Sequence, residues 1–81
     1  MALFLSDEFQ KDYGKIKDAA TKERLKKALV GLLENPEKGK NLHYDLKGKR
    51  SLRADPFRII YQLVGPDIHV LKLGNRKNVY E

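Results

Sequence analysis

Cysteine is absent from this chain of 81 residues, which excludes disulfide bonds, thiolate zinc sites and a cysteine nucleophile. Six glycines and three prolines are too few for a low-complexity chain. No apolar run approaches the ~18–20 residues of a membrane span, and residues 1–7 lack the basic and apolar segments of a secretory signal. We therefore expect a cytoplasmic protein without a membrane partner, a location that the lack of cysteine also suits.

The length allows a single domain, which we place over residues 1–81. A chain of this size buries roughly 60% of the surface that it exposes when unfolded. Such burial supports one small core and leaves no room for a separate cofactor domain, so we expect no cofactor.

The net charge of +6 lies entirely in one half of the chain. Residues 1–37 carry seven basic and seven acidic side chains, whereas residues 38–81 carry ten basic and four acidic ones. This distribution favours a polyanionic partner. A solvated basic surface without a partner is the alternative.

Apolar periodicity predicts two helices in the first half. Phe9, Tyr13 and Ile16 recur at i, i+4 and i+7 after the capping residue Ser6. A second helical stripe consists of Leu25, Ala28, Leu29, Leu32 and Leu33. Asn35-Pro36 ends it, and the break between the two helices is expected near Asp18–Thr21. The pattern indicates a helical hairpin.

The second half has the pattern of strands. Residues 57–64 are rich in β-branched and aromatic side chains, and the Gly65-Pro66-Asp67 turn separates them from a strand over residues 68–73. Shorter strands are expected at residues 51–54 and, before the helices, at residues 3–5. The order β-α-α-β-β-β indicates the α+β class.

Neither a metal site nor a Ser/His/Asp triad is predicted. His43 and His69 are the only histidines, and the carboxylates have no metal-ligand spacing. His69 is expected on a strand face and His43 in a polar loop. No nucleophile elbow surrounds Ser6 or Ser51.

Basic residues in the predicted strands are the stronger signal. Because side chains alternate along a strand, Lys49, Ser51 and Arg53 share one face and Arg50 lies on the other. Arg58 interrupts an apolar run, which fits either a sheet face that opens to a cleft or an arginine that reaches solvent at the strand start.

The tail holds one further pair of polar side chains. Arg76 and Tyr80 are four residues apart, so one helical turn would bring them to the same side. A mobile, charged terminus is the alternative.

Several motifs occur in the order of one known family. They are Leu46-Lys47-Gly48, Ser51-Leu52-Arg53, Phe57-Arg58-Ile59-Ile60-Tyr61, Val70-Leu71-Lys72-Leu73-Gly74-Asn75-Arg76 and Val79-Tyr80. Together with the helical half, they resemble the RelE/ParE toxin superfamily, and the ending is most similar to its RelE-like branch. The resemblance implies a small, largely antiparallel four-stranded sheet packed on an N-terminal helical hairpin.

The resemblance also implies an activity and partners. RelE-like toxins cleave mRNA in the ribosomal A site without a metal and are silenced by a cognate antitoxin, whereas ParE-like toxins act on DNA gyrase. The expected function is therefore a ribosome-dependent mRNA endonuclease. A non-catalytic gyrase inhibitor or a degenerate RNA-binding relative is the alternative.

Residue roles follow from the same resemblance. Arg58 would stabilise the transition state, Arg76 would contact the scissile phosphate, and Tyr80 would activate the 2′-OH. Lys49 would lower the pKa of that tyrosine, and Arg53 would bind RNA phosphate.

The chain departs from the family at one position of this set. Ser51 stands where better-studied members have a second lysine, which lowers the basic density of the face. Ser51 is still expected among the RNA-binding residues, and Lys47, Arg50 and Lys40 are expected to compensate for the missing lysine.

Overall fold

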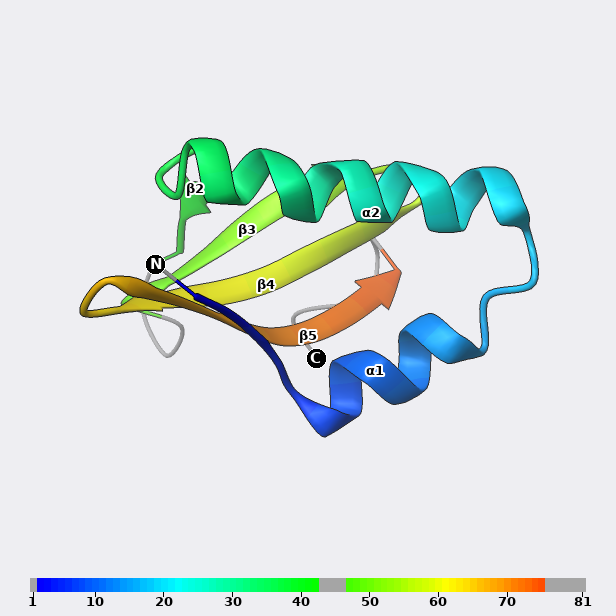
Figure 1. Ribbon diagram of the computed structural model, residues 1–81, viewed down its shortest axis with the longest axis horizontal. Coiled ribbons are helices and arrows are strands. Elements are labelled where there is room, and N and C mark those ends of the chain that lie inside the picture. The colour runs from blue at the N-terminus through cyan, green and yellow to red at the C-terminus, as the bar shows by residue number, and fades with distance from the viewer. Residues whose placement is uncertain (1, 43–46, 76–81) are drawn as a thin grey trace.

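The computed structural model describes residues 2–42 and 47–75 and shows two helices and one sheet (Figure 1). The elements, in chain order, are β1 (Leu3–Leu5), α1 (Asp7–Gly14), α2 (Ala19–Glu34), β2 (Lys40–Asn41), β3 (Lys49–Ala54), β4 (Phe57–Val64) and β5 (Asp67–Asn75). The predicted α+β class is confirmed. No helix within these residues is long and apolar enough to cross a membrane.

The sheet has the strand order β1-β5-β4-β3-β2. β1 runs parallel to β5, and the other neighbouring strands are antiparallel, as expected for a largely antiparallel sheet. The expectation of four strands was one short, because Lys40 and Asn41 of β2 pair with β3. Two polar residues carry no hydrophobic periodicity, so the sequence does not reveal this strand.

Side-chain caps set where both helices begin. The Ser6 hydroxyl accepts a hydrogen bond from the Phe9 amide at 3.0 Å, and the Asp18 carboxylate accepts one from the Thr21 amide at 3.2 Å. Hydrogen bonding to the Thr21 side chain is the main reason why the pKa of Asp18 is lowered. Because Asp18 is the cap, α2 begins at Ala19, and the break between the helices covers residues 15–18, which overlap the predicted Asp18–Thr21 at Asp18.

One face of the sheet carries the hydrophobic core. There α1 packs against β5 and α2 against β3 (Figure 1). The buried cluster consists of Phe9, Leu25, Leu29, Leu32, Leu52, Ala54, Ile59, Tyr61, Ile68, Val70 and Leu73. Both described helices contribute to this one cluster, so the opposite face, which we name the open face, carries neither of them.

Tyr61 joins the core to the connection that follows α2. Its ring is buried, and its hydroxyl donates to the Pro36 carbonyl and accepts from the Gly39 amide, both at 2.8 Å. Burial raises the pKa of Tyr61 above that of an ordinary phenol. A Cβ at position 39 would lie only 2.5 Å from the Tyr61 hydroxyl oxygen, so this close approach requires glycine.

A β-bulge at Leu71 reverses which side chains of β5 face the core after that residue. Tyr61 pairs with Val70 and Ile60 pairs with Lys72, which leaves Leu71 without a partner on β4. The Leu71 carbonyl instead accepts a hydrogen bond from the Ser6 hydroxyl at 2.7 Å. The extra residue places Leu73 in the core and Lys72 on the open face.

Candidate functional site

Four basic side chains from three neighbouring strands share the open face. Lys49 and Arg53 come from β3, Arg58 from β4 and Lys72 from β5. The register places them together, because Arg53 pairs with Arg58 and the Ile60 position lies between Ser51 and Lys72. We name these four residues the basic face. The predicted alternation of β3 is therefore confirmed, with Lys49, Ser51 and Arg53 on one side.

Arg58 lies on β4, the middle strand of the basic face, and is partly buried. Its Nη1 donates a hydrogen bond to the Ser51 hydroxyl at 3.2 Å. This contact compensates part of the cost of removing a guanidinium from water. Arg58 is also the second residue of β4, so the two interpretations that the sequence left open both stay predictions.

Ser51 is only 3% exposed, beside Arg58. Its hydroxyl accepts the hydrogen bond from Arg58 and so helps to orient the guanidinium. A lysine at this position would put a second cation at a buried site next to Arg58, where like charges repel. The serine thus makes the face less basic but gives Arg58 a neutral acceptor.

Arg53 and Arg50 have their own partners. Nε of Arg53 lies 3.0 and 3.1 Å from the two carboxylate oxygens of Asp55, and both side chains are more than half exposed. Arg50 is on the other side of β3, as predicted, and its Nη1 donates to the carbonyls of Glu37 and Gly39. Its guanidinium therefore holds the loop before β2 and does not belong to the basic face. Lys47 is exposed in the turn before β3.

Lys72 was not among the residues predicted for the site. Strict alternation from Ile68 and Val70 would turn Lys72 toward the core, and only the bulge at Leu71 reverses this. Leucine at position 73 is the signal that could have revealed it, because a core position suits a leucine better than a lysine. His69 lies on a strand, as predicted, and its ring centroid is 5.0 Å from that of Phe4.

Arg76, Tyr80 and His43 lie outside the described residues. The structure does show where β5 ends: Gly74 pairs with Arg58 and Asn75 with Phe57. The last described residue, Asn75, therefore lies one register position from the residue that pairs with Arg58. Among residues 2–42 and 47–75, no group of three His, Asp or Glu side chains could hold a metal ion.

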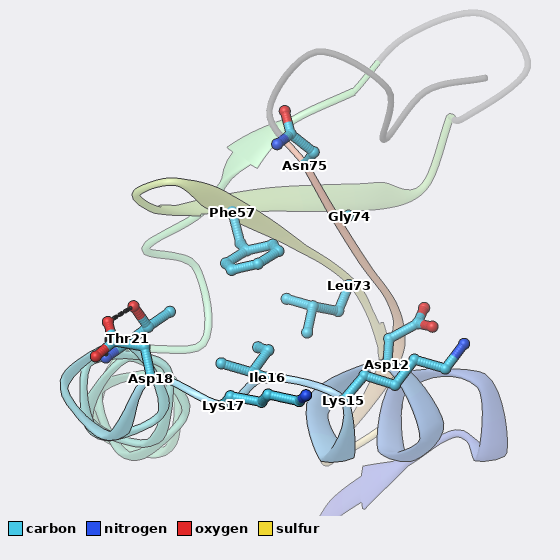
Figure 2. Close-up of a pocket in the computed structure, with 10 residues that line it drawn as sticks. All are labelled: Asp12, Lys15, Ile16, Lys17, Asp18, Thr21, Phe57, Leu73, Gly74 and Asn75. Atoms are coloured by element: carbon cyan, nitrogen blue, oxygen red, sulfur yellow. Dashed lines mark hydrogen bonds between the residues drawn. The ribbon is translucent and has the colours of Figure 1, made fainter.

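An apolar hollow on the helix side of the sheet is separate from the basic face. A cavity of about 550 Å³ lies between the end of α1, the start of α2 and the end of β5 (Figure 2). Ile16, Phe57 and Leu73 form its apolar part, with Lys15 and Asp18 among the polar residues around it. Leu73 is a core residue, so this cavity opens on the helix side of the sheet and contains no residue of the basic face.

The fold is similar to the folds of several toxins of toxin–antitoxin systems. The YoeB/ParE toxin from Agrobacterium tumefaciens superposes with a TM-score of 0.82 at 21% identity, over 94% of this chain and 99% of that one. The toxin-antitoxin complex RelBE from E. coli gives 0.73 at 26% identity, over 90% and 93%. YafQ from E. coli gives 0.74 at 24% identity, over 93% and 92%.

The family itself follows from the sequence comparison. The family described as the ParE toxin of the type II toxin-antitoxin system parDE matches residues 3–80. The chain therefore belongs to this family, within the RelE/ParE superfamily that its motifs resemble, and is a toxin of a type II toxin–antitoxin system. The search among curated proteins found no match.

Proposed function

We propose that this toxin is a ribosome-dependent mRNA endonuclease that inhibits translation in the cytoplasm. The observation that carries the proposal is the basic face, where Arg58 is hydrogen-bonded to Ser51 and β5 ends one register position away. This arrangement supports a phosphate site at Arg58 with the Arg76–Tyr80 segment following directly in sequence. The similarity to RelE-like toxins supports the same function.

The proposed reaction is an in-line attack of a ribose 2′-OH on the adjacent phosphate. The new O–P bond closes a 2′,3′-cyclic phosphate, and the bond from phosphorus to the 5′ oxygen breaks. The 2′-OH loses its proton, and the leaving 5′ oxygen gains one. The nucleophile belongs to the RNA, so the step needs no water molecule as nucleophile and no metal. It does need cations, because negative charge accumulates on the phosphorane.

The side chains divide this work. Arg58 stabilises the phosphorane, since a guanidinium stays protonated and binds phosphate oxygens in pairs. Arg76 contacts the scissile phosphate, and Tyr80 takes the 2′ proton. A phenol has a pKa of about 10, so Tyr80 needs neighbouring cations, of which Lys49 is one. Arg53 and Lys47 bind flanking phosphates, Ser51 orients Arg58 on the same face, and Arg50 supports β3 from the other side.

The ParE family match favours a second candidate function. A ParE-like toxin would inhibit DNA gyrase without cutting nucleic acid, and it would have no use for Arg58 and Tyr80 arranged around a phosphate. In either case we expect a cognate antitoxin as partner, because the similar E. coli chain is part of a toxin-antitoxin complex.

Primer extension on a defined mRNA in a purified translation system tests the proposal. The unmutated chain should produce cuts within A-site codons only when ribosomes are present. Arg58→Ala, Arg76→Ala and Tyr80→Phe should each abolish the cuts, and Lys11→Ala, an exposed lysine of α1, should not. Intact mRNA with a folded chain, together with inhibition of gyrase supercoiling, would establish the second candidate instead.

A further inference from the structure

One row of side chains on the open face leads from the basic face to an exposed aromatic ring. Lys49 of β3 pairs with Gln62 of β4. His69 of β5 pairs with Gln62 on one side and with Phe4 of β1 on the other. Because sequence neighbours of Gln62, His69 and Phe4 pack in or against the core, these three side chains point to the open face, as Lys49 does. We name the four residues the cross-sheet row.

Phe4 is the aromatic end of this row. It is 50% exposed, and it is the only exposed Phe or Tyr among residues 2–42 and 47–75. Its ring lies 5.0 Å from that of His69, centroid to centroid, with 31° between the ring planes. The contact with His69 covers one side of the Phe4 ring, so the exposed part is available to stack on a further ring.

The middle of the cross-sheet row offers hydrogen-bonding groups. In the described part of the chain, the side-chain amide of Gln62 and the imidazole of His69 make no hydrogen bond. A Cβ at Gly48 would lie 3.9 Å from Nε2 of Gln62, so this amide extends toward the turn before β3. An amide and an imidazole beside an exposed ring can bind the polar edge of a flat heteroaromatic ligand.

The charges on the two sides of the row differ in sign. Lys49 belongs both to the row and to the basic face, and Lys72 follows His69 on the open face after the bulge. Beyond the row, toward the turn between β4 and β5, Asp67 carries a carboxylate that accepts a hydrogen bond from the Ala2 amide at 3.0 Å. A polyanion is therefore attracted from the side of the basic face and repelled from the side of the turn.

We propose that the cross-sheet row binds an unpaired base of the substrate RNA, which stacks on Phe4, while the basic face binds the backbone of the same strand. The proposal rests on the proposed function and adds a subsite to it. Gln62 is four positions from Arg58 on β4, which is about 13 Å in a strand, so the base belongs to a flanking nucleotide and not to the scissile one.

The composition of this face favours a base over a protein segment as the occupant. Cations beside an exposed aromatic ring are the combination with which proteins bind single-stranded nucleic acid. A protein segment would need several apolar anchors. Phe4 is the only apolar member of the cross-sheet row, and the four residues of the basic face are all charged.

Binding of the full chain to a single-stranded RNA hexamer at low salt, measured by fluorescence anisotropy, tests this assignment. The hexamer carries 2′-O-methyl sugars, which prevent cleavage, and each nucleotide in turn is made abasic, which keeps its phosphate but removes its base. The variants are Phe4→Leu, which keeps an apolar side chain, and Phe4→Trp, which keeps an aromatic one. Val30→Ala, at an equally exposed residue of α2, is the matched control.

In the unmutated chain, we expect an abasic nucleotide at one position to weaken binding about fivefold or more, the effect of losing one stacked base. Phe4→Leu should weaken the binding of intact RNA by a similar factor, with no further loss when that one base is absent. Its salt slope should stay that of the unmutated chain, because no phosphate contact is removed. Phe4→Trp and Val30→Ala should bind as the unmutated chain does.

Several results would overturn the assignment. One is an abasic loss that is as large in Phe4→Leu as in the unmutated chain, and another is the absence of any RNA binding at low salt. Weaker binding of Phe4→Leu to duplex DNA, whose bases are already paired and stacked, would show that Phe4 acts through the fold. Thermal unfolding of each variant gives the same check, since a binding loss that matches the unfolded fraction is structural.

Cleavage plays no part in this measurement, so the two proposals can fail separately. A chain that stacks a base on Phe4 but never cuts mRNA contradicts only the proposed function. Ribosome-dependent cuts at an unchanged rate in Phe4→Leu, together with equal abasic losses in this variant and the unmutated chain, contradict only the base site.

Discussion

Arg53 and Arg58 are direct cross-strand partners in the antiparallel pairing of β3 and β4, so two guanidinium groups extend from the same face of the sheet. Like charges in this position destabilise a sheet. Each arginine has a different local partner, the carboxylate of Asp55 for Arg53 and the hydroxyl of Ser51 for Arg58. A fold that keeps this repulsion on an open face gains nothing in stability from it, which is why we assign the pair to binding.

Replacing Arg58 should separate activity from stability. We expect Arg58→Ala to lower mRNA cleavage by about 100-fold or more, the effect of losing one preorganised donor to transition-state charge. The melting temperature should stay equal or rise, because the repulsion with Arg53 is relieved. Cleavage assays and thermal unfolding of the same preparation check this, and a variant that melts well below the unmutated chain would show that Arg58 is structural.

Arg50 should show the opposite behaviour. Its guanidinium donates to the carbonyls of Glu37 and Gly39, so Arg50→Ala should lower the free energy of unfolding by about 1 kcal/mol. Cleavage per folded molecule should remain within a few-fold of the unmutated chain. Urea unfolding measures the first quantity and primer extension the second. A loss of cleavage as large as that of Arg58→Ala would place Arg50 on the RNA.

Two glycines form a matched pair for alanine substitution. Gly39→Ala would put a Cβ 2.5 Å from the Tyr61 hydroxyl oxygen, so we expect a loss of about 1–3 kcal/mol as the buried hydroxyl loses its partner. Gly31 lies within α2, and a Cβ there would be at an ordinary contact distance from Nζ of Lys38. Gly31→Ala should therefore raise the free energy of unfolding by up to about 1 kcal/mol. Chemical unfolding of both variants checks the signs, and a neutral Gly39→Ala would refute the close packing.

The high-pH side of the stability profile should depend on Tyr61. Burial raises its pKa in the folded chain, so the folded state retains the phenolic proton at a pH where the unfolded state has lost it. This contribution is complete below the ordinary phenol pKa of about 10 and is lost as the pH rises through the folded value. Tyr61→Phe should therefore unfold with a weaker pH dependence above pH ~10. If the stability of both proteins changed with pH in the same way, titration of Tyr61 would not be the cause of the pH dependence.

Asp18 should act on the acid side. Hydrogen bonding to the Thr21 side chain lowers the pKa of Asp18 in the folded chain. Its contribution to the stability of the fold is therefore present when the pH is above the pKa of Asp18 in the unfolded chain. It is lost as the pH falls through the folded value, below 3.8. Asp18→Asn still caps α2 but has no titrating proton, so the stability gap between the two proteins should close toward low pH. Melting temperatures from pH 5 to pH 2 measure it, and a constant gap would contradict the mechanism.

Much of the fold could be predicted because long periodic segments carry strong signals. The stripe of Leu25, Leu29 and Leu32 and the apolar run around Ile59 both reached the core as expected. β2 could not be predicted, because its two polar residues form a strand only by pairing with β3, and they have no hydrophobic periodicity of their own. The helix break begins a few residues earlier than predicted and ends at Asp18, because this cap starts α2 directly.

The candidate site was predictable only as far as alternation holds. Lys49, Ser51 and Arg53 obey it, so their shared face was correct. Lys72 escaped prediction because the bulge at Leu71, whose carbonyl accepts a hydrogen bond from the distant Ser6 hydroxyl, interrupts the alternation there. The partner of Arg58 was likewise hidden, since a serine seven positions away in sequence becomes its neighbour only across the strand pair.

The parallel pairing of β1 with β5 has a consequence for biosynthesis. β1 is the first described strand to be made, and its only sheet neighbour is the last of them. Until residues 67–75 have emerged from a ribosome, β1 has no partner strand, and α1 has no β5 to pack against. Folding must therefore wait for most of the chain, and a truncated product that stops before β5 cannot assemble the basic face.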